Sequence, residues 1–160
     1  MQVLVLYYSR TGNTKRLAEA IAEGVREVEG VDCLLRSTGE VKKEDFLASD
    51  GIIAGSPVYF GTMASELKKV FDDFVSLRPK MENRIGAAFA TSADPSGGKE
   101  TTIISILEAM LIYGMIVCGD PLSATGHYGV ASCGRPAKEI LSNGRKLGMR
   151  VAELIQRLKG

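Results

Sequence analysis

Residues 3–14 read Val-Leu-Val-Leu-Tyr-Tyr-Ser-Arg-Thr-Gly-Asn-Thr, and they set the expectation for the whole fold. The first half, Val3 to Tyr7, is a near-continuous apolar run, typical of a strand that is buried on both faces. The second half is a polar turn, after which apolar residues recur at helical spacing from Leu17 to Val28. The stretch therefore predicts a buried strand, a polar loop and a helix in direct succession.

The rest of the chain repeats this alternation. Further strands are predicted at residues 31–35, 51–55, 85–91 and 115–118. Helical patterns are centred on residues 46–47, 67–75, 103–113 and 140–158. Strands separated by helices imply right-handed crossovers and a parallel sheet with helices on both faces. We therefore expect one α/β domain over residues 1–160, with its ligand site beyond the C-terminal ends of the strands.

Composition and charge exclude several classes of partner. The chain has 160 residues and a net charge of +1, so it carries no electrostatic signature of binding to nucleic acid or to an anionic membrane. No apolar run approaches the ~20 residues of a membrane span, and the N-terminus lacks the basic region of a signal peptide. Three scattered cysteines and one histidine predict a cytoplasmic protein without a metal site.

The loop Ser9-Arg10-Thr11-Gly12-Asn13-Thr14 is a candidate phosphate site. A helix N-terminus leaves about four backbone N–H groups unpaired, and its dipole favours an anion. The loop hydroxyls add donors, and Gly12 lets the backbone curl close to a phosphate. The alternative is an ordinary helix N-cap, which uses the same residue types. Because the chain lacks both a Walker A motif and a Gly-x-Gly-x-x-Gly fingerprint, we expect a terminal monophosphate as the ligand.

A second loop, Ser56-Pro57-Val58-Tyr59-Phe60-Gly61, follows the third predicted strand. Pro57 stiffens the turn and Gly61 permits a positive φ before the next helix. Tyr59 and Phe60 at a strand end would offer a flat apolar surface to a planar ring. Adjacent aromatic residues are more often part of a core, but their place in a Gly/Pro loop beside the phosphate loop favours the ring-binding interpretation.

A third loop follows the fourth predicted strand and includes Thr91-Ser92-Ala93-Asp94 and Gly97-Gly98. Its hydroxyl groups and backbone amides can bind the hydroxyls and carbonyls of a ligand. Asp94 has two interpretations of equal weight. Either its carboxylate lies near the ligand and disfavours an anionic form of that ligand by charge repulsion, or Asp94-Pro95-Ser96-Gly97 is simply a surface turn.

These three loops carry a family resemblance. Ser-x-Thr-Gly-Asn-Thr after an N-terminal strand resembles the FMN phosphate loop of flavodoxins. Gly55–Met63 and Thr91–Thr102 are similar to the flavin loops of the quinone-reducing branch of that superfamily, the tryptophan-repressor-binding-protein family. The resemblance implies a three-layer sandwich whose five-stranded parallel sheet has the order 2-1-3-4-5. It also implies FMN as the cofactor, bound by the three loops.

Two further residues enter through the same resemblance. Tyr113 stands where the quinone reductases have a histidine near the flavin, and His127 lies in a segment that resembles their Gly-x-Pro-Tyr-Gly. Both are candidate groups on the substrate side, where a tyrosine can stack on a quinone or nicotinamide. A core position for Tyr113 and an exposed loop position for His127 are the alternatives. No acid or base is compulsory, because the flavin carries the chemistry.

The resemblance implies a choice between two redox functions. One is reduction of a quinone or similar acceptor, with NAD(P)H as donor, in a ping-pong cycle; the other is a non-enzymatic electron carrier that docks on a redox partner protein. An FMN-binding sensory module is a third hypothesis. Electron-carrier flavodoxins are strongly acidic, so the net charge of +1 favours the reductase. The resemblance also implies a homo-oligomer, either a dimer or a tetramer.

Overall fold

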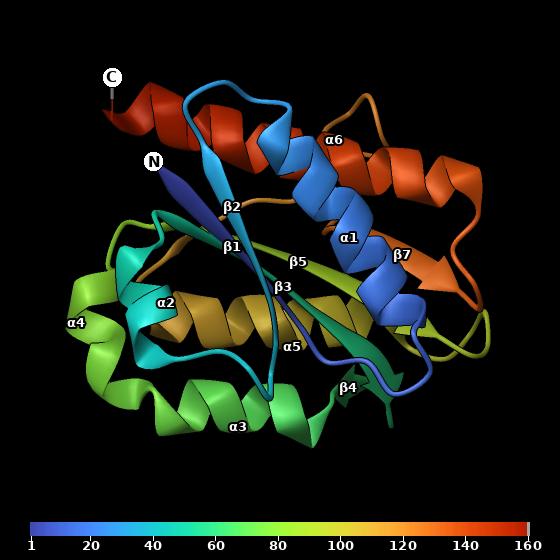
Figure 1. Ribbon diagram of the computed structural model, residues 1–160. Coiled ribbons are helices and arrows are strands. Elements are labelled where there is room, and N and C mark those ends of the chain that lie inside the picture. The colour runs from blue at the N-terminus through green and yellow to red at the C-terminus, as the bar shows by residue number, and fades with distance from the viewer. Residues whose placement is uncertain (160) are drawn as a thin grey trace.

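The computed structural model describes residues 1–159, which form a sheet covered by helices on both faces (Figure 1). The strands are β1 (Gln2–Tyr7), β2 (Asp32–Ser37), β3 (Gly51–Tyr59), β4 (Thr62–Met63), β5 (Ile85–Ser92), β6 (Ile116–Val117) and β7 (Val130–Cys133). The helices are α1 (Asn13–Arg26), α2 (Lys43–Ala48), α3 (Ser65–Asp73), the 3₁₀ helix η1 (Val75–Leu77), α4 (Arg78–Met81), α5 (Lys99–Ile112) and α6 (Lys138–Lys159). In Figure 1, α1 and α6 cover one face of the sheet, while α2, α3, α4 and α5 lie on the other. The predicted α/β class and three layers are confirmed.

The parallel strands follow the order β2-β1-β3-β5-β6, which confirms the expected order 2-1-3-4-5. The fifth position, however, is divided between two strands. The N-terminal end of β5 pairs with β6, and its C-terminal end, from Phe89 to Ser92, pairs with β7. The prediction missed β7 because four residues containing Ser and Cys do not make a distinct apolar run. Its strand conformation depends on pairing with β5.

Three other short elements were also missed. Strand β4 pairs antiparallel with the end of β3 through Val58↔Met63 and Tyr59↔Thr62. Helices η1 and α4 occupy residues 75–81, of which only residue 75 belonged to a predicted helix. These segments are too short for hydrophobic periodicity to mark them, so their conformation depends on neighbouring parts of the fold.

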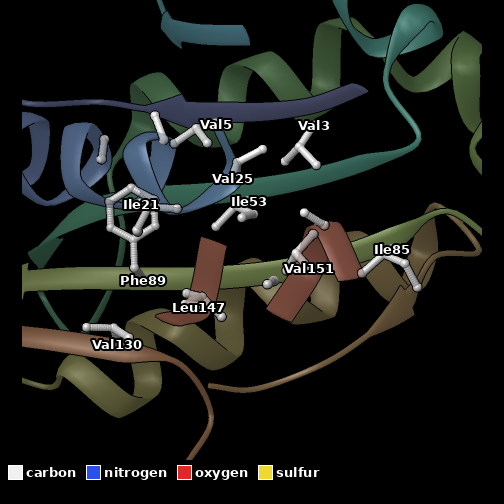
Figure 2. Close-up of a cluster of buried hydrophobic side chains, with 14 of the residues drawn as sticks. Val3, Val5, Ile21, Val25, Ile53, Ile85, Phe89, Val130, Leu147 and Val151 are labelled. Atoms are coloured by element: carbon white, nitrogen blue, oxygen red, sulfur yellow. The ribbon is translucent and has the colours of Figure 1, made fainter. Parts of the chain in front are cut away.

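The core lies in two layers, one on each side of the sheet. Along β1, Val3 and Val5 point to the α1/α6 side, while Leu4 and Leu6 point to the α3/α5 side. All four are fully buried, which explains why β1 is a continuous apolar run. Figure 2 shows the first of these clusters, where side chains of β1, β3 and β5 meet those of α1 and α6.

Helices α1 and α6 approach each other closely. A Cβ on Gly148 would lie 2.1 Å from the carbonyl oxygen of Ile21, and one on Gly24 would lie 2.0 Å from the carbonyl oxygen of Arg145. Neither position tolerates a side chain, because the obstructing atoms belong to the backbone. The contact therefore fixes the distance between the C-terminal half of α1 and the middle of α6.

Candidate functional site

Three loops meet at the C-terminal edge of the sheet. They follow β1, β3 and β5, which are neighbours in the sheet order, and they surround a cleft of ≈ 150 Å³. The cleft is lined by Arg10, Thr11, Asn13 and Thr14 from the first loop, Pro57, Val58 and Tyr59 from the second, and Thr91, Ser92 and Ala93 from the third. The fold thus brings together segments that are about 80 residues apart in the sequence.

The first loop ends in an uncapped helix. Gly12 has φ 94°, in the left-handed region, and no side chain caps the first turn of α1. The Ser9 hydroxyl instead accepts a hydrogen bond from the Gly12 N–H at 3.1 Å, which curls the loop over the start of the helix. The first turn of α1 also contains no acidic residue. These features favour the phosphate site over the ordinary N-cap, because the backbone donors at the helix start have no side-chain acceptor.

The charged and hydroxyl groups of this loop have different surroundings. The Thr14 side chain is buried, and its hydroxyl lies 2.8 Å from that of Thr91 in a hydrogen bond that links α1 to β5. The Thr14 hydroxyl is thus engaged with Thr91, while the residue itself lines the cleft at the start of α1. Arg10 is exposed at the edge of the cleft. The nearby Lys15 forms an exposed ion pair with Glu19, 3.9 Å away.

The second loop is a tight hairpin. Phe60 and Gly61 both have positive φ, 51° and 75°, and they connect β3 to β4. Two consecutive residues of this kind match the turn that suits the twist of a β-hairpin. Phe60 is a bulky residue in the left-handed region and is fully exposed, at 107% of its reference area. The exposed position agrees with the ring-binding interpretation and excludes the core interpretation for this residue.

Ser56 and Tyr59 support the same hairpin from different sides. The Ser56 side chain is fully buried, and its hydroxyl accepts a hydrogen bond from the Ala64 N–H at 2.8 Å. Ser56 thus shapes the loop from within. The half-buried Tyr59 ring meets the Tyr8 ring edge to face, with 6.4 Å between centroids. A hydrogen bond to the Glu66 carboxylate raises the pKa of Tyr8 above its ordinary value.

In the third loop, Asp94 forms a surface turn. Its exposed carboxylate accepts hydrogen bonds from the Ser96 N–H (2.9 Å) and hydroxyl (2.8 Å). These bonds hold the pKa of Asp94 below its ordinary value. The Ser92 hydroxyl donates to the Asp94 carbonyl at 2.7 Å. The geometry therefore favours the turn interpretation of Asp94, while Ser92 and Ala93 remain on the cleft wall.

The second and third loops are in direct contact at two glycines. Gly98 has φ 94°, and a Cβ at this position would lie 3.0 Å from the Cα of Gly61. The Thr101 hydroxyl lies 2.6 Å from the Gly61 carbonyl oxygen and 3.0 Å from that of Gly98. Thr101 was not among the predicted site residues. The sequence could have indicated it, because Thr101 closely follows the Gly97-Gly98 pair and lies in the first turn of α5.

Tyr113 does not belong to this site, so its predicted role on the substrate side is wrong. Tyr113 directly follows the C-terminal end of α5, at the edge of the sheet opposite the cleft. The carbonyl of the next residue, Gly114, accepts a hydrogen bond from the N–H of Asn83, which lies just before the start of β5. The Tyr113 ring packs among Phe46 and Phe71, and its hydroxyl donates to the Phe71 carbonyl. Burial raises the pKa of Tyr113 to about 12. The core interpretation is the correct one.

His127 lies apart from the three-loop cleft. It is exposed in the segment between β6 and β7 and borders a separate cavity. Its backbone N–H donates to Asp120 Oδ1 at 2.9 Å, and the other carboxylate oxygen, Oδ2, accepts bonds from Thr125 and Gly126. Asp120 is almost fully buried and organises this whole segment, a role that the sequence did not reveal.

Other kinds of site receive no support from the described residues. Over residues 1–159, no group of three or more His, Cys, Asp or Glu side chains is placed to hold a metal ion. No helix within this range is long and apolar enough to cross a membrane.

Comparisons with known proteins agree with the geometry. The family model described as NADPH-dependent FMN reductase matches residues 1–129. A protein named flavodoxin from Aquifex aeolicus is 39% identical, over 96% of this chain and 86% of its own length. A protein named NAD(P)H dehydrogenase (quinone) from Archaeoglobus fulgidus is 35% identical, over 98% of each chain. The solved structure of a flavodoxin from the domain Archaea superposes with a TM-score of 0.81 at 30% identity, covering 98% of this chain and 99% of that one.

Proposed function

Because the chain belongs to the NADPH-dependent FMN reductase family, we propose that it is an FMN-dependent oxidoreductase that transfers two electrons from NAD(P)H to a quinone or a similar small acceptor. The observation that carries this proposal is the uncapped start of α1 beneath the curled Ser9–Gly12 turn, which has the donors and the open space that a monophosphate needs.

The residues of the cleft fit FMN in three parts. Ser9, Thr11 and the backbone N–H groups of residues 12–14 would hold the phosphate. The wall made by Thr91, Ser92 and Ala93 would hold the ribityl chain and the pyrimidine edge. Tyr59 and Phe60 would border the ring system. When bound, FMN supplies hydride-accepting chemistry, and the protein's part is to bind, orient and shield it.

The geometry also supports the order in which donor and acceptor would act. No side chain in the cleft is placed as a dedicated acid or base, and the fully exposed Phe60 leaves the outer side of the hairpin open to small molecules. A donor and an acceptor that use the same open side must bind in turn. The proposed cycle is therefore ping-pong, with Phe60 as an apolar contact for each ring.

An electron carrier is the second candidate, favoured by the similarity to the protein named flavodoxin over almost the full chain. The two candidates differ in turnover. FMN-loaded protein is mixed with NADH or NADPH and benzoquinone, and absorbance of the nicotinamide is followed. We expect steady consumption of at least one nicotinamide. Absence of turnover, together with a stable neutral semiquinone on half-reduction, would establish the carrier instead.

We also propose that the protein is a cytoplasmic homo-oligomer. Leu111, Ile112 and Ile116 are exposed apolar residues at the end of α5 and on the edge strand β6. They would be covered in a homo-oligomer, and light scattering on the purified protein measures its mass. The three cysteines are free, which agrees with a cytoplasmic protein.

A further inference from the structure

A second cavity of ≈ 240 Å³ lies beside β7, separate from the three-loop cleft. Its inner wall is apolar and comes from three elements: Ile103 on α5, Val130 on β7 and Ile140 on α6. Ile103 and Val130 are almost fully buried. Thr125 and His127, both exposed, form its solvent-facing side, here called the mouth, in the segment that joins β6 to β7.

One buried polar side chain lines this cavity without a partner. Asn143 on α6 is 6% exposed and lines the cavity, and within residues 1–159 its amide makes no hydrogen bond. Among the described residues, Thr102 Oγ1 is the one side-chain polar atom that is both fully inaccessible and without a hydrogen bond. The unpaired amide atoms of Asn143 are therefore not fully inaccessible. The Asn143 amide is thus open to the cavity. An unpaired amide in an apolar pocket is costly, and a group that bonds to it recovers that cost.

The cavity is held open by its surroundings. Asp120 accepts hydrogen bonds from Thr125, Gly126 and His127, and its carbonyl oxygen accepts one from Arg150 on α6 at 2.8 Å. These bonds fix the mouth relative to α6, so a ligand would not have to order the segment on binding.

Size and charge define the ligand class. An apolar cavity of about 150 Å³ holds a benzene-sized ring, so ≈ 240 Å³ accommodates one ring with a substituent. The Glu100 carboxylate at the rim disfavours an anion. The Asn143 amide can both donate to and accept from an oxygen of the ligand.

From these observations we propose that the cavity between α5, β7 and α6 is a second binding site, which takes a small uncharged aromatic ring bearing a hydroxyl or carbonyl group. The ring packs on Ile103, Val130 and Ile140, and its oxygen bonds to Asn143. The site does not depend on the redox function of the flavin cleft, because none of its lining residues lines that cleft.

The test is a pair of NMR titrations of the FMN-saturated protein with p-cresol and with toluene, which differ by one hydroxyl group. We expect saturable shifts of the Asn143 side-chain amide and contacts from p-cresol to the Ile103 and Ile140 methyl groups. Wild-type protein should bind p-cresol at least about tenfold more tightly than toluene, because toluene leaves the amide unpaired.

Asn143→Leu should reverse this preference, since leucine has similar volume and no amide. Gln156→Leu is the matched control, because it removes an exposed amide from the same helix, where the side chain bonds to Glu29. It should leave the p-cresol preference unchanged. The proposal is overturned if wild-type protein shows no saturable shift, if the shifts are confined to residues 91–98, or if toluene binds as well as p-cresol. The wild-type titrations decide the matter even if the leucine variant does not fold.

Discussion

At the scale of single residues, the candidate site depends on backbone geometry more than on side-chain chemistry. Gly12 and Gly98 both have φ 94°; Gly12 is the N-cap of α1, which starts at the cleft, and Gly98 is the N-cap of α5. The hydroxyl groups of Thr14 and Ser56, two residues expected to contact the cofactor, also form hydrogen bonds that shape the loops. The sequence pattern placed the loops correctly after β1, β3 and β5, whereas the hydrogen bonds of their hydroxyl groups required the structure.

Gly12→Ala tests the importance of this geometry. An L-residue in the left-handed region costs roughly 1–2 kcal/mol, and nothing lies within 4 Å of the new Cβ, so strain is the only local effect. Relaxation of the loop should weaken FMN binding about tenfold, as measured by quenching of flavin fluorescence. Gly39→Ala is the control, because it also meets nothing within 4 Å and needs no positive φ. Equal FMN affinities of the two variants would contradict a preformed phosphate loop.

Asp120→Asn tests a residue that the sequence did not reveal. Burial alone raises the pKa of Asp120, but the bonds from Thr125, His127 and Gly126 outweigh it and leave the pKa below its ordinary value of 3.8. A carboxylate with a lowered folded pKa stabilises the protein above 3.8, and this contribution is lost as the pH falls through the folded pKa.

We therefore expect Asp120→Asn to lower the free energy of unfolding by about 2 kcal/mol at neutral pH, and the difference from wild type to narrow as the pH is lowered. Urea denaturation at several pH values measures both. Asp32→Asn, at an exposed position, is the control and should have little effect. A difference that stays constant down to strongly acidic pH would show that the charge of Asp120 is not involved.

At the scale of secondary-structure elements, the long strands and helices were predictable, as were the short β6 and α2, whereas β4, β7, η1 and α4 were not. Strands β1, β3 and β5 are apolar runs buried on both faces, so their sequence carries the signal. Strands β4, β6 and β7 have two to four residues, and their pairing partners hold them in place. A local sequence pattern cannot predict a strand whose conformation depends on pairing with a distant segment.

Gly148→Ala tests the close contact between α1 and α6. The new Cβ would lie 2.1 Å from the Ile21 carbonyl oxygen, so the helices must separate. We expect a loss of about 3 kcal/mol in the free energy of unfolding, by urea denaturation. Ser142→Ala, at an exposed position of the same helix, is the control and should change stability by less than about 0.5 kcal/mol. Similar stability of both variants would mean that the helices can move apart at no cost.

At the scale of the whole molecule, the sheet order brings the three loops to one edge, and cofactor binding should therefore stabilise the entire fold. A ligand at 100 times its dissociation constant adds about 2.7 kcal/mol to the free energy of unfolding. For a chain of this length, that corresponds to a rise in Tm of about 5–10 °C.

Riboflavin separates the phosphate contribution from that of the ring. It lacks the phosphate that the α1 N-terminus is proposed to bind, so at the same concentration it should raise Tm by less than about 2 °C. Thermal unfolding followed by circular dichroism measures both ligands. Equal protection by riboflavin and FMN would place the binding energy in the ring loops and not at the start of α1.

The sequence by itself determined the α/β class, the long buried strands and the loop that starts α1, because each depends on residues close together in the chain. Only the tertiary structure decided where Tyr113 lies, how β6 and β7 share one edge of the sheet, and why Asp120 and Asn143 matter. Tyr113 follows a helix that runs away from the cleft, and Asp120 and Asn143 act through segments that meet only after folding. Local patterns record burial and turns, whereas the partners of a buried polar group are set by the packing of the whole chain.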